Sequence, residues 1–313
     1  MSEIPPEAGE AGRPVPSPGL PGEAPRPPEK EWAVMAVALG TPDGRIRGQV
    51  RVDTGPMRLA DLVPTAHELT GVIAARANHR AGREGKTITC RAGCGACCRQ
   101  MVPLSAPEAF HLMEMVQDLD PVRRAFYLGR FEAIQARLEA EKMVGPMLDL
   151  AVGSDPQRSL NRKYFAMQMA CPFLVDESCS IHPDRPVACR EYNVTSSALW
   201  CRDPFGNAVE KVPMPLPLSA ALAWLTADLT GAPPALIPLT LVPWWVAGHR
   251  EWNERKWPGL ELFRRFMEIA GGPPRMEGAA AGGGSAPGAA PPGSAPQSGP
   301  PPAGPPGGTA PRQ

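Results

Sequence analysis

The sequence predicts a mostly α-helical fold with a small β-hairpin near its N-terminal end. Three observations predict this fold class. Several segments of the 313-residue chain begin with helix-capping residues and carry apolar residues at helical spacing. Alternation of apolar and other residues is confined to one segment near residue 50. Pro-rich and Gly-rich stretches at both ends belong to neither kind of element.

Both ends of the chain are predicted to be disordered. Residues 1–30 are crowded with proline, and no charged residue occurs from Gly278 to Pro311. Such segments cannot bury enough apolar surface to offset the entropy lost on ordering. We therefore expect disordered tails at 1–30 and 273–313. A single domain is expected over 31–272, since roughly 240 residues suit one core.

The first part of the domain, residues 31–88, is predicted to hold the hairpin and one helix. Strands are expected at Trp32–Leu39 and Arg45–Val52, joined by a turn from Thr41 to Gly44. Apolar residues at helical spacing then predict a helix near Pro64–Arg80.

Three helices are predicted within the second part, residues 89–201. Ser105 and Glu108 have the spacing of a capping box, and Asp120-Pro121 is a second helix start. A third helix, expected over Pro156–Met169, leads into Cys171. The apolar faces of these helices need one another for burial, so antiparallel packing would return the chain to its starting point.

The last part, residues 202–272, is predicted to form a Trp-rich helical layer over the cysteine region. Helices are expected around Ser219–Leu229, Trp244–Arg255 and Pro258–Ala270. The tryptophans of this part are Trp224, Trp244, Trp245, Trp252 and Trp257.

Composition argues against several classes of partner. Lys plus Arg equals Asp plus Glu at 32 each, so no net basic field would attract nucleic acid or an anionic membrane. The uncharged stretch from Leu229 to Gly248 has the length of a membrane span, but four prolines interrupt it. It predicts a buried, broken helical segment instead. The N-terminal residues lack the pattern of a secretory signal, so we expect a cytoplasmic protein.

The cysteines fall mainly in two short windows, a first window from Cys90 to Cys98 and a second window from Cys171 to Cys189. The eight cysteines are Cys90, Cys94, Cys97, Cys98, Cys171, Cys179, Cys189 and Cys201. In a reducing compartment, clustered thiols are more often metal ligands than disulfides. Gly93 and Gly95 would allow the tight turn that brings neighbouring sulfurs to one side. We therefore expect all eight as metal ligands, with both windows contributing to one site inside the helical body.

The order of these motifs resembles a known family. Cys-x3-Cys-x2-Cys-Cys is followed by Cys-Pro-Phe-Leu, a further Cys, and Arg-Pro-x-x-Cys-Arg, all between Thr89 and Tyr192. This pattern is similar to the YkgJ-like cysteine-cluster family, a zinc- or iron-chelating domain that includes the flagellin lysine N-methylases. The resemblance implies metal chelation by the matching positions. These are Cys90, Cys94, Cys97, Cys98, Cys171, Cys179 and Cys189.

Three other residues lie among the expected ligands. His182 stands where family members commonly carry Tyr, so the resemblance does not imply that a ligand is needed there. Arg185 and Arg190 are expected to offset the charge of clustered thiolates and to donate hydrogen bonds to sulfur.

Several functions are compatible with this pattern. Eight thiols could form two tetrahedral zinc sites or hold one or two iron–sulfur clusters. The leading interpretation is a metal-binding protein in metal handling, electron transfer or protein maturation. The alternatives are an enzyme like the protein-lysine N-methylases and a structural zinc module that binds a protein partner. The first three cysteines also have the spacing of radical S-adenosylmethionine enzymes, but the chain lacks the strands of their barrel.

Overall fold

The computed structural model describes residues 31–41, 44–149 and 155–271, with only the backbone of residues 155–157. The tails expected to be disordered at 1–30 and 273–313 lie outside the described residues. So do the two central residues of the predicted hairpin turn.

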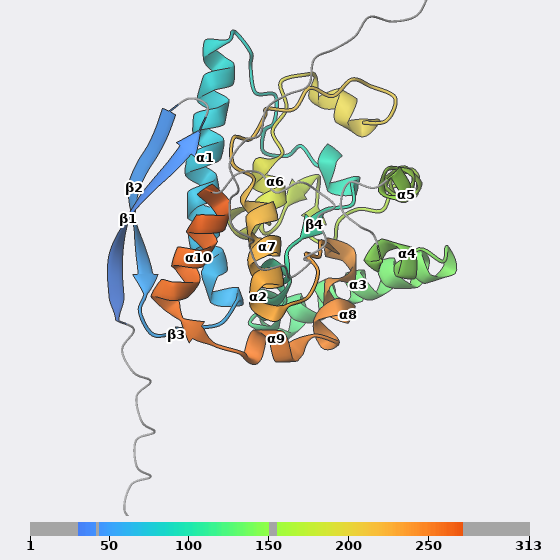
Figure 1. Cartoon of the computed structure of the whole chain (residues 1–313). Helices are drawn as coiled ribbons and strands as arrows, with labels where there is room; N and C mark the ends of the chain where they lie inside the picture. The colour runs from blue at the N-terminus through green and yellow to red at the C-terminus, as the bar shows by residue number, and fades with distance from the viewer. Residues whose placement is uncertain (1–30, 42–43, 150–154, 272–313) are drawn as a thin grey trace, which may run out of the picture. The chain divides into compact units, whose positions relative to one another are not determined.

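The predicted hairpin is confirmed. Strands β1 (Trp32–Thr41) and β2 (Gly44–Asp53) pair antiparallel along their whole length. Ile46, Val50 and Val52 of β2 are buried, and because their positions differ by even numbers of residues, they lie on one face of the strand. This face lies against helices α1 (Val63–Arg83) and α10 (Gly259–Gly271), as Figure 1 shows.

The described body is mostly helical. Besides α1 and α10, its α-helices are α2 (Ala106–Gln117), α3 (Pro121–Ala140), α4 (Val144–Leu148), α5 (Asp155–Ala166), α6 (Val187–Glu191), α7 (Leu218–Thr230), α8 (Val242–Ala247) and α9 (Arg250–Glu254). Short 3-10 turns are η1 (Ala60–Leu62), η2 (Ala96–Arg99), η3 (His182–Asp184), η4 (Ala198–Arg202) and η5 (Leu239–Leu241).

Three two-residue ladders join segments of this body. Strand β3 (Pro56–Met57) pairs with β8 (Trp257–Pro258), and β4 (Pro103–Leu104) pairs with β7 (Ile237–Pro238). Strand β5 (Leu174–Val175) pairs with β6 (Ser178–Cys179) in a local hairpin. All three pairs are antiparallel.

The predicted helix starts are confirmed at two positions. Ser105 and Glu108 form the expected capping box at the start of α2, and the Ser105 N–H donates to the Glu108 carboxylate at 3.0 Å. At the start of α3, the Asp120 carboxylate accepts from the backbone N–H groups of Val122 and Arg123. Both caps supply partners for N–H groups that a helix cannot bond internally.

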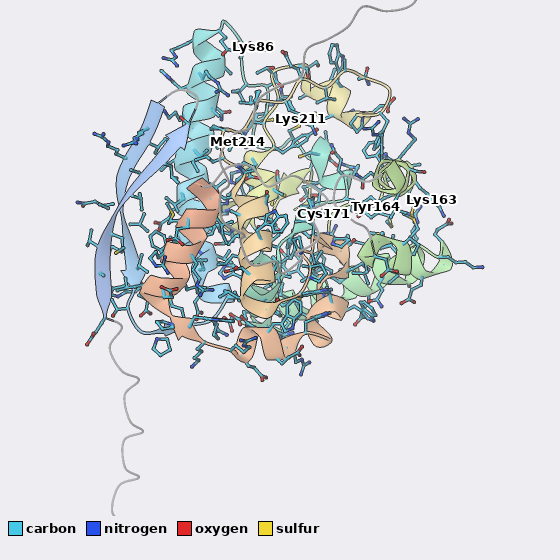
Figure 2. All side chains as sticks on the ribbon, viewed as in Figure 1. Lys86, Lys163, Tyr164, Cys171, Lys211 and Met214 are labelled. Atoms are coloured by element: carbon cyan, nitrogen blue, oxygen red, sulfur yellow. The ribbon has the colours of Figure 1, made fainter. Side chains whose placement is uncertain are left out.

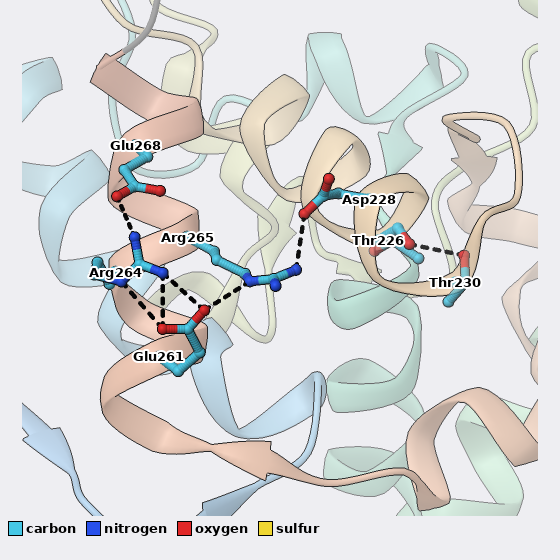
Figure 3. Close-up of polar contacts among 7 residues, drawn as sticks. All are labelled: Thr226, Asp228, Thr230, Glu261, Arg264, Arg265 and Glu268. Atoms are coloured by element: carbon cyan, nitrogen blue, oxygen red, sulfur yellow. Dashed lines mark hydrogen bonds and ion pairs between the residues drawn. The ribbon is translucent and has the colours of Figure 1, made fainter. Parts of the chain in front are cut away.

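Helix α2 lies at the centre of the apolar core. It contacts α1, α7 and α8, and its Phe110 ring packs on Trp245 with 5.5 Å between ring centroids. Helix α10 packs on α7, where Arg265 pairs with Asp228 of α7 and Glu261 of α10 (Figure 3). These contacts join the C-terminal helices to the middle of the chain.

The helix expected over Trp244–Arg255 is divided into α8 and α9. Gly248 and His249 separate the two, and the His249 ring stacks on Trp245 with 4.1 Å between centroids. Glycine is a poor helix former, so the break falls there. The expected helix over Pro156–Met169 also ends early, at Ala166, before Gln168 adopts a positive φ of 51°.

The uncharged stretch before α8 is broken, as predicted. Helix α7 ends at Thr230 and is followed by Gly231, which has a left-handed φ of 74°; β7 and η5 come before α8 begins. The described residues include no helix with the length and apolarity needed to cross a membrane.

Candidate metal centre

Helices α2 to α5 carry the chain away from the first cysteine window and back to it. Consecutive helices of this excursion contact one another. At its end, the backbone N–H of Cys171 donates to the carbonyl of Cys98 at 2.7 Å. Although 72 residues separate these two cysteines in the sequence, a hydrogen bond joins their backbones. Cys171 also lies beside the buried Tyr164 of α5 (Figure 2).

A single cavity of about 580 Å³ lies between the two windows. Every cysteine of the chain lines it: Cys90, Cys94, Cys97, Cys98, Cys171, Cys179, Cys189 and Cys201. All eight are free thiols, and only Cys201 is fully buried. None of the tryptophans of the C-terminal layer lines this cavity.

The first window is a loop that ends in the 3-10 turn η2. Gly93 has a left-handed φ of 75°, a conformation that glycine adopts without steric cost. Gly95 instead allows a close approach, because a Cβ there would lie 2.7 Å from Leu174 Cδ1 and 2.7 Å from a Glu177 carboxylate oxygen. Both glycines expected to shape the loop therefore do so, for two different reasons.

The second window begins with the β5–β6 hairpin. Asp176 and Glu177 at its tip both have positive φ, 49° and 57°, as a tight two-residue hairpin turn requires. The hairpin returns the chain so that Cys179 pairs with Leu174. An ion pair of 2.6 Å between Glu177 and Arg99 then fastens the tip to the first window.

Cys201 joins the site through the 3-10 turn η4, which contacts η2. Its side chain is 4% exposed and packs with Cys94 and the buried Val194 in a small apolar cluster. The backbone N–H of Val194 donates to the sulfur of Cys90 at 3.4 Å. Residue 201 therefore belongs with the first window in space, although it follows the second in sequence.

The surroundings of the cavity raise the pKa values of several of its thiols. Burial raises the pKa of Cys171 to about 12. Burial and three neighbouring cysteines raise the pKa of Cys189 well above its ordinary value. A hydrogen bond with Cys98 is the main cause of the raised pKa of Cys97. Such thiols lose their protons when a metal ion takes the place of the protons, so the donor set fits a metal that prefers sulfur.

Arg185 and Arg190 have different roles in this structure. Arg185 lines the cavity, and its buried Nε has no hydrogen-bond partner among the described residues. Arg190 instead donates to the backbone carbonyls of Arg185 and Pro183, so it holds the loop that carries Arg185. His182 is exposed, and its ring nitrogen lies 3.0 Å from an Arg185 nitrogen.

The thiols surround the cavity without forming a closed coordination group. Within the described part of the chain, no three His, Cys, Asp or Glu side chains are already placed to hold a metal ion together. Zinc–sulfur bonds measure about 2.3 Å, so the thiolates would have to draw closer to a bound ion. The case that these cysteines fit a metal ion therefore rests on the chemistry of their sulfur atoms and on the cavity that they share.

Residues 89–209 match the model of a family described as CxxCxxCC, a putative zinc- or iron-chelating domain. This segment is similar to the CxxCxxCC domain. It includes all eight cysteines, and it confirms the resemblance over the windows that carry it. Comparison with curated proteins and with solved structures gave no match.

Two polar residues, one inside the CxxCxxCC segment and one beyond it, line the cavity without having been expected there. Asn161 of α5 is one, and its buried side-chain oxygen has no hydrogen-bond partner among the described residues. Lys211, just beyond the domain, is another, with its ammonium 4.9 Å from the centre of the Tyr192 ring. Neither lies in a motif, so no sequence signal distinguishes them from other polar residues.

Proposed function

We propose that this protein binds zinc or iron, as ions or as an iron–sulfur cluster, through cysteine thiolates of the cavity. The observation that carries the proposal is the lining of one cavity by every cysteine of the chain. Cysteines placed at random in a domain of this size would not converge in this way. The chelating function described for the CxxCxxCC domain supports the same conclusion.

The surroundings suit thiolate ligation. Several thiolates in one site repel one another, and a nearby guanidinium offsets that charge. Arg185 lies close enough to lower the pKa values of Cys90 and Cys179 against the larger effect of burial, which raises them. When bound, a metal supplies the positive charge that replaces the thiol protons. Sulfur ligands favour zinc or iron–sulfur chemistry over magnesium or calcium.

We also propose that residues 31–272 form one domain with three parts, 31–88, 89–201 and 202–272. The main apolar core supports this, because it includes Leu69, Phe110 and Phe263, one from each part. Free thiols at all eight cysteines suit the cytoplasm, the reducing compartment in which we place the protein.

For the bound metal we propose a role in metal handling, electron transfer or maturation of another protein. The test is elemental analysis and an optical spectrum of protein purified without oxygen. We expect at least one tightly bound equivalent of zinc or iron. A straw-to-brown colour bleached by dithionite indicates an iron–sulfur cluster and electron transfer, and a colourless zinc protein indicates metal handling or a structural role. Well under one equivalent, with failed reconstitution, would contradict the proposal.

A further inference from the structure

We propose that the eight thiols form two four-thiolate metal sites that meet at the adjacent residues Cys97 and Cys98. This inference rests on the proposed metal binding and specifies how the ligands divide. One group, the Val194 set, comprises Cys90, Cys94 and Cys201. The other, the β6 set, comprises Cys171, Cys179 and Cys189. Each set would take its fourth thiolate from the Cys97–Cys98 pair.

The Val194 set is held together by one buried residue. The Val194 N–H bonds the sulfur of Cys90 at 3.4 Å, and the Val194 side chain packs with Cys94 and Cys201. Thr89 secures this arrangement, because its N–H donates to the Val194 carbonyl at 3.0 Å. The turn η4, which carries Cys201, contacts η2, the turn that follows Cys94.

The β6 set lies on the side of the main apolar core. Cys171 and Cys179 both pack against this core. Ser180 secures the hairpin between them by donating from its backbone N–H to the Phe173 carbonyl at 2.9 Å. Cys189 lies on α6, whose Val187 is buried in the same core. Among the described residues, no member of the Val194 set packs against that core.

Cys97 and Cys98 lie between the two sets. Both belong to the turn η2, which contacts the turn η4 that carries Cys201. The backbone carbonyl of Cys98 accepts a hydrogen bond from the N–H of Cys171. Three thiols in each set and two between them give four thiolates per site, the number that zinc and iron–sulfur clusters use.

The charges of the cavity wall suit two anionic sites. Four thiolates around a divalent ion leave a net charge of about −2 at each site. Lys211 lines the cavity and pairs with Val194 in an isolated β-bridge, so it lies beside the Val194 set. Arg185 lines the cavity from the loop between Cys179 and Cys189. Each set therefore has a nearby cation that would offset its charge.

The division separates Cys94 from Cys179, whereas the sequence suggested one site shared by both windows. Each proposed site still combines distant segments. In one site, Cys201 joins cysteines of the first window. In the other, Cys97 or Cys98 of the first window joins cysteines of the second. Binding at either site would close a set that is open in this structure.

The experiment is a cadmium titration of the full, metal-free chain under reducing, oxygen-free conditions. Cadmium content and thiolate-to-cadmium absorbance are measured at each step, and free thiols are counted with a thiol reagent. We expect two equivalents, with reactive thiols falling from eight to about four after the first and to about zero after the second. One equivalent at saturation would overturn the two-site inference, and less than one would contradict metal binding itself.

Paired substitutions then test which thiols belong together. Two double variants each remove two thiols from one set: Cys94→Ser/Cys201→Ser and Cys179→Ser/Cys189→Ser. Each variant should still bind one equivalent of cadmium tightly. The matched control, Cys94→Ser/Cys179→Ser, also removes two thiols but should weaken both equivalents. Loss of both equivalents from either same-set variant would overturn the division. If a variant fails to fold, the wild-type thiol count still decides the number of sites.

Discussion

At the scale of single residues, the buried carboxylate of Glu108 joins two helix starts. One of its oxygens accepts from the Ser105 N–H at the start of α2. The other accepts from the Val187 N–H at 2.7 Å, at the start of the helix that carries Cys189. This one side chain therefore fixes the cysteine-bearing α6 against the centre of the core.

Replacing Glu108 by Gln should destabilise the fold. The amide has only one acceptor oxygen, so its NH2 group would face either the Ser105 or the Val187 N–H without a bond. Leaving a buried donor unpaired costs roughly 1–3 kcal/mol, measurable by urea unfolding. Glu132→Gln on the exposed face of α3 is the control and should change stability by less than about 0.5 kcal/mol. Equal stability of the two variants would contradict this role for Glu108.

His67 gives the fold a defined dependence on acid. Its ring is 8% exposed, and its Nε2 has no hydrogen-bond partner among the described residues. Burial, with the charge of Arg190 adding, lowers the pKa of His67 from 6.5 to about 3. The unfolded chain binds this proton more readily than the folded chain does, so stability must rise with pH between these two values.

The prediction is that stability falls as the pH is lowered from 6.5 toward about 3, and that His67→Gln reduces this slope. His79→Gln is the control, because His79 lies on the same helix with an exposed side chain. Urea midpoints at several pH values, on metal-free protein, measure the slope. A His67→Gln slope equal to that of the wild type would show that His67 does not contribute.

At the scale of elements, the β5–β6 hairpin is positioned by its contact with Gly95. Gly95→Ala would force Leu174 and Glu177 away, since the new Cβ would also lie 3.2 Å from the Glu177 carbonyl oxygen. We expect a loss of roughly 1–3 kcal/mol and weaker metal retention. Gly129→Ala is the matched control, because nothing lies within 4 Å of its Cβ on α3. Removing a helical glycine should raise stability by about 0.5–1 kcal/mol. If thermal unfolding shows that Gly95→Ala lowers stability and Gly129→Ala raises it, the close packing at Gly95 is supported. Stability changes of the same sign in the two variants would contradict it.

Elements governed by local sequence could be predicted, whereas those made by distant contacts could not. The β1–β2 hairpin and the starts of α2 and α3 depend on neighbouring residues, and their residues identify them. The ladder of β4 with β7 joins segments more than 130 residues apart, so neither strand carries a local signal. The break at Gly248 was missed because tryptophans on both sides continue the helical spacing.

The candidate site shows the same limit. Spacing identified the eight cysteines because thiols in short windows are a strong chemical signal. It could not show that Cys201 lies with Cys90, or that Glu177 of the hairpin tip holds Arg99, because these contacts depend on tertiary packing. The proposed grouping of the thiols rests on the fold and not on the spacing of the cysteines.

At the scale of the whole molecule, metal binding should contribute to the stability of the fold. The proposed ligands come from segments that the helical excursion brings together, so an ion bound by them would tie these segments to one another. With free metal at about 100 times its Kd, the gain is roughly 2.7 kcal/mol. Treatment with a chelator should lower the Tm, and added zinc should restore it. An unchanged Tm in protein shown to have lost its metal would contradict this coupling.

X-ray absorption spectroscopy at the edge of the bound metal tests the central claim most directly, because it identifies the ligand atoms. A first shell of sulfur atoms is expected, at about 2.3 Å if the metal is zinc. A shell made mainly of nitrogen or oxygen atoms would contradict ligation by the cysteines of this cavity.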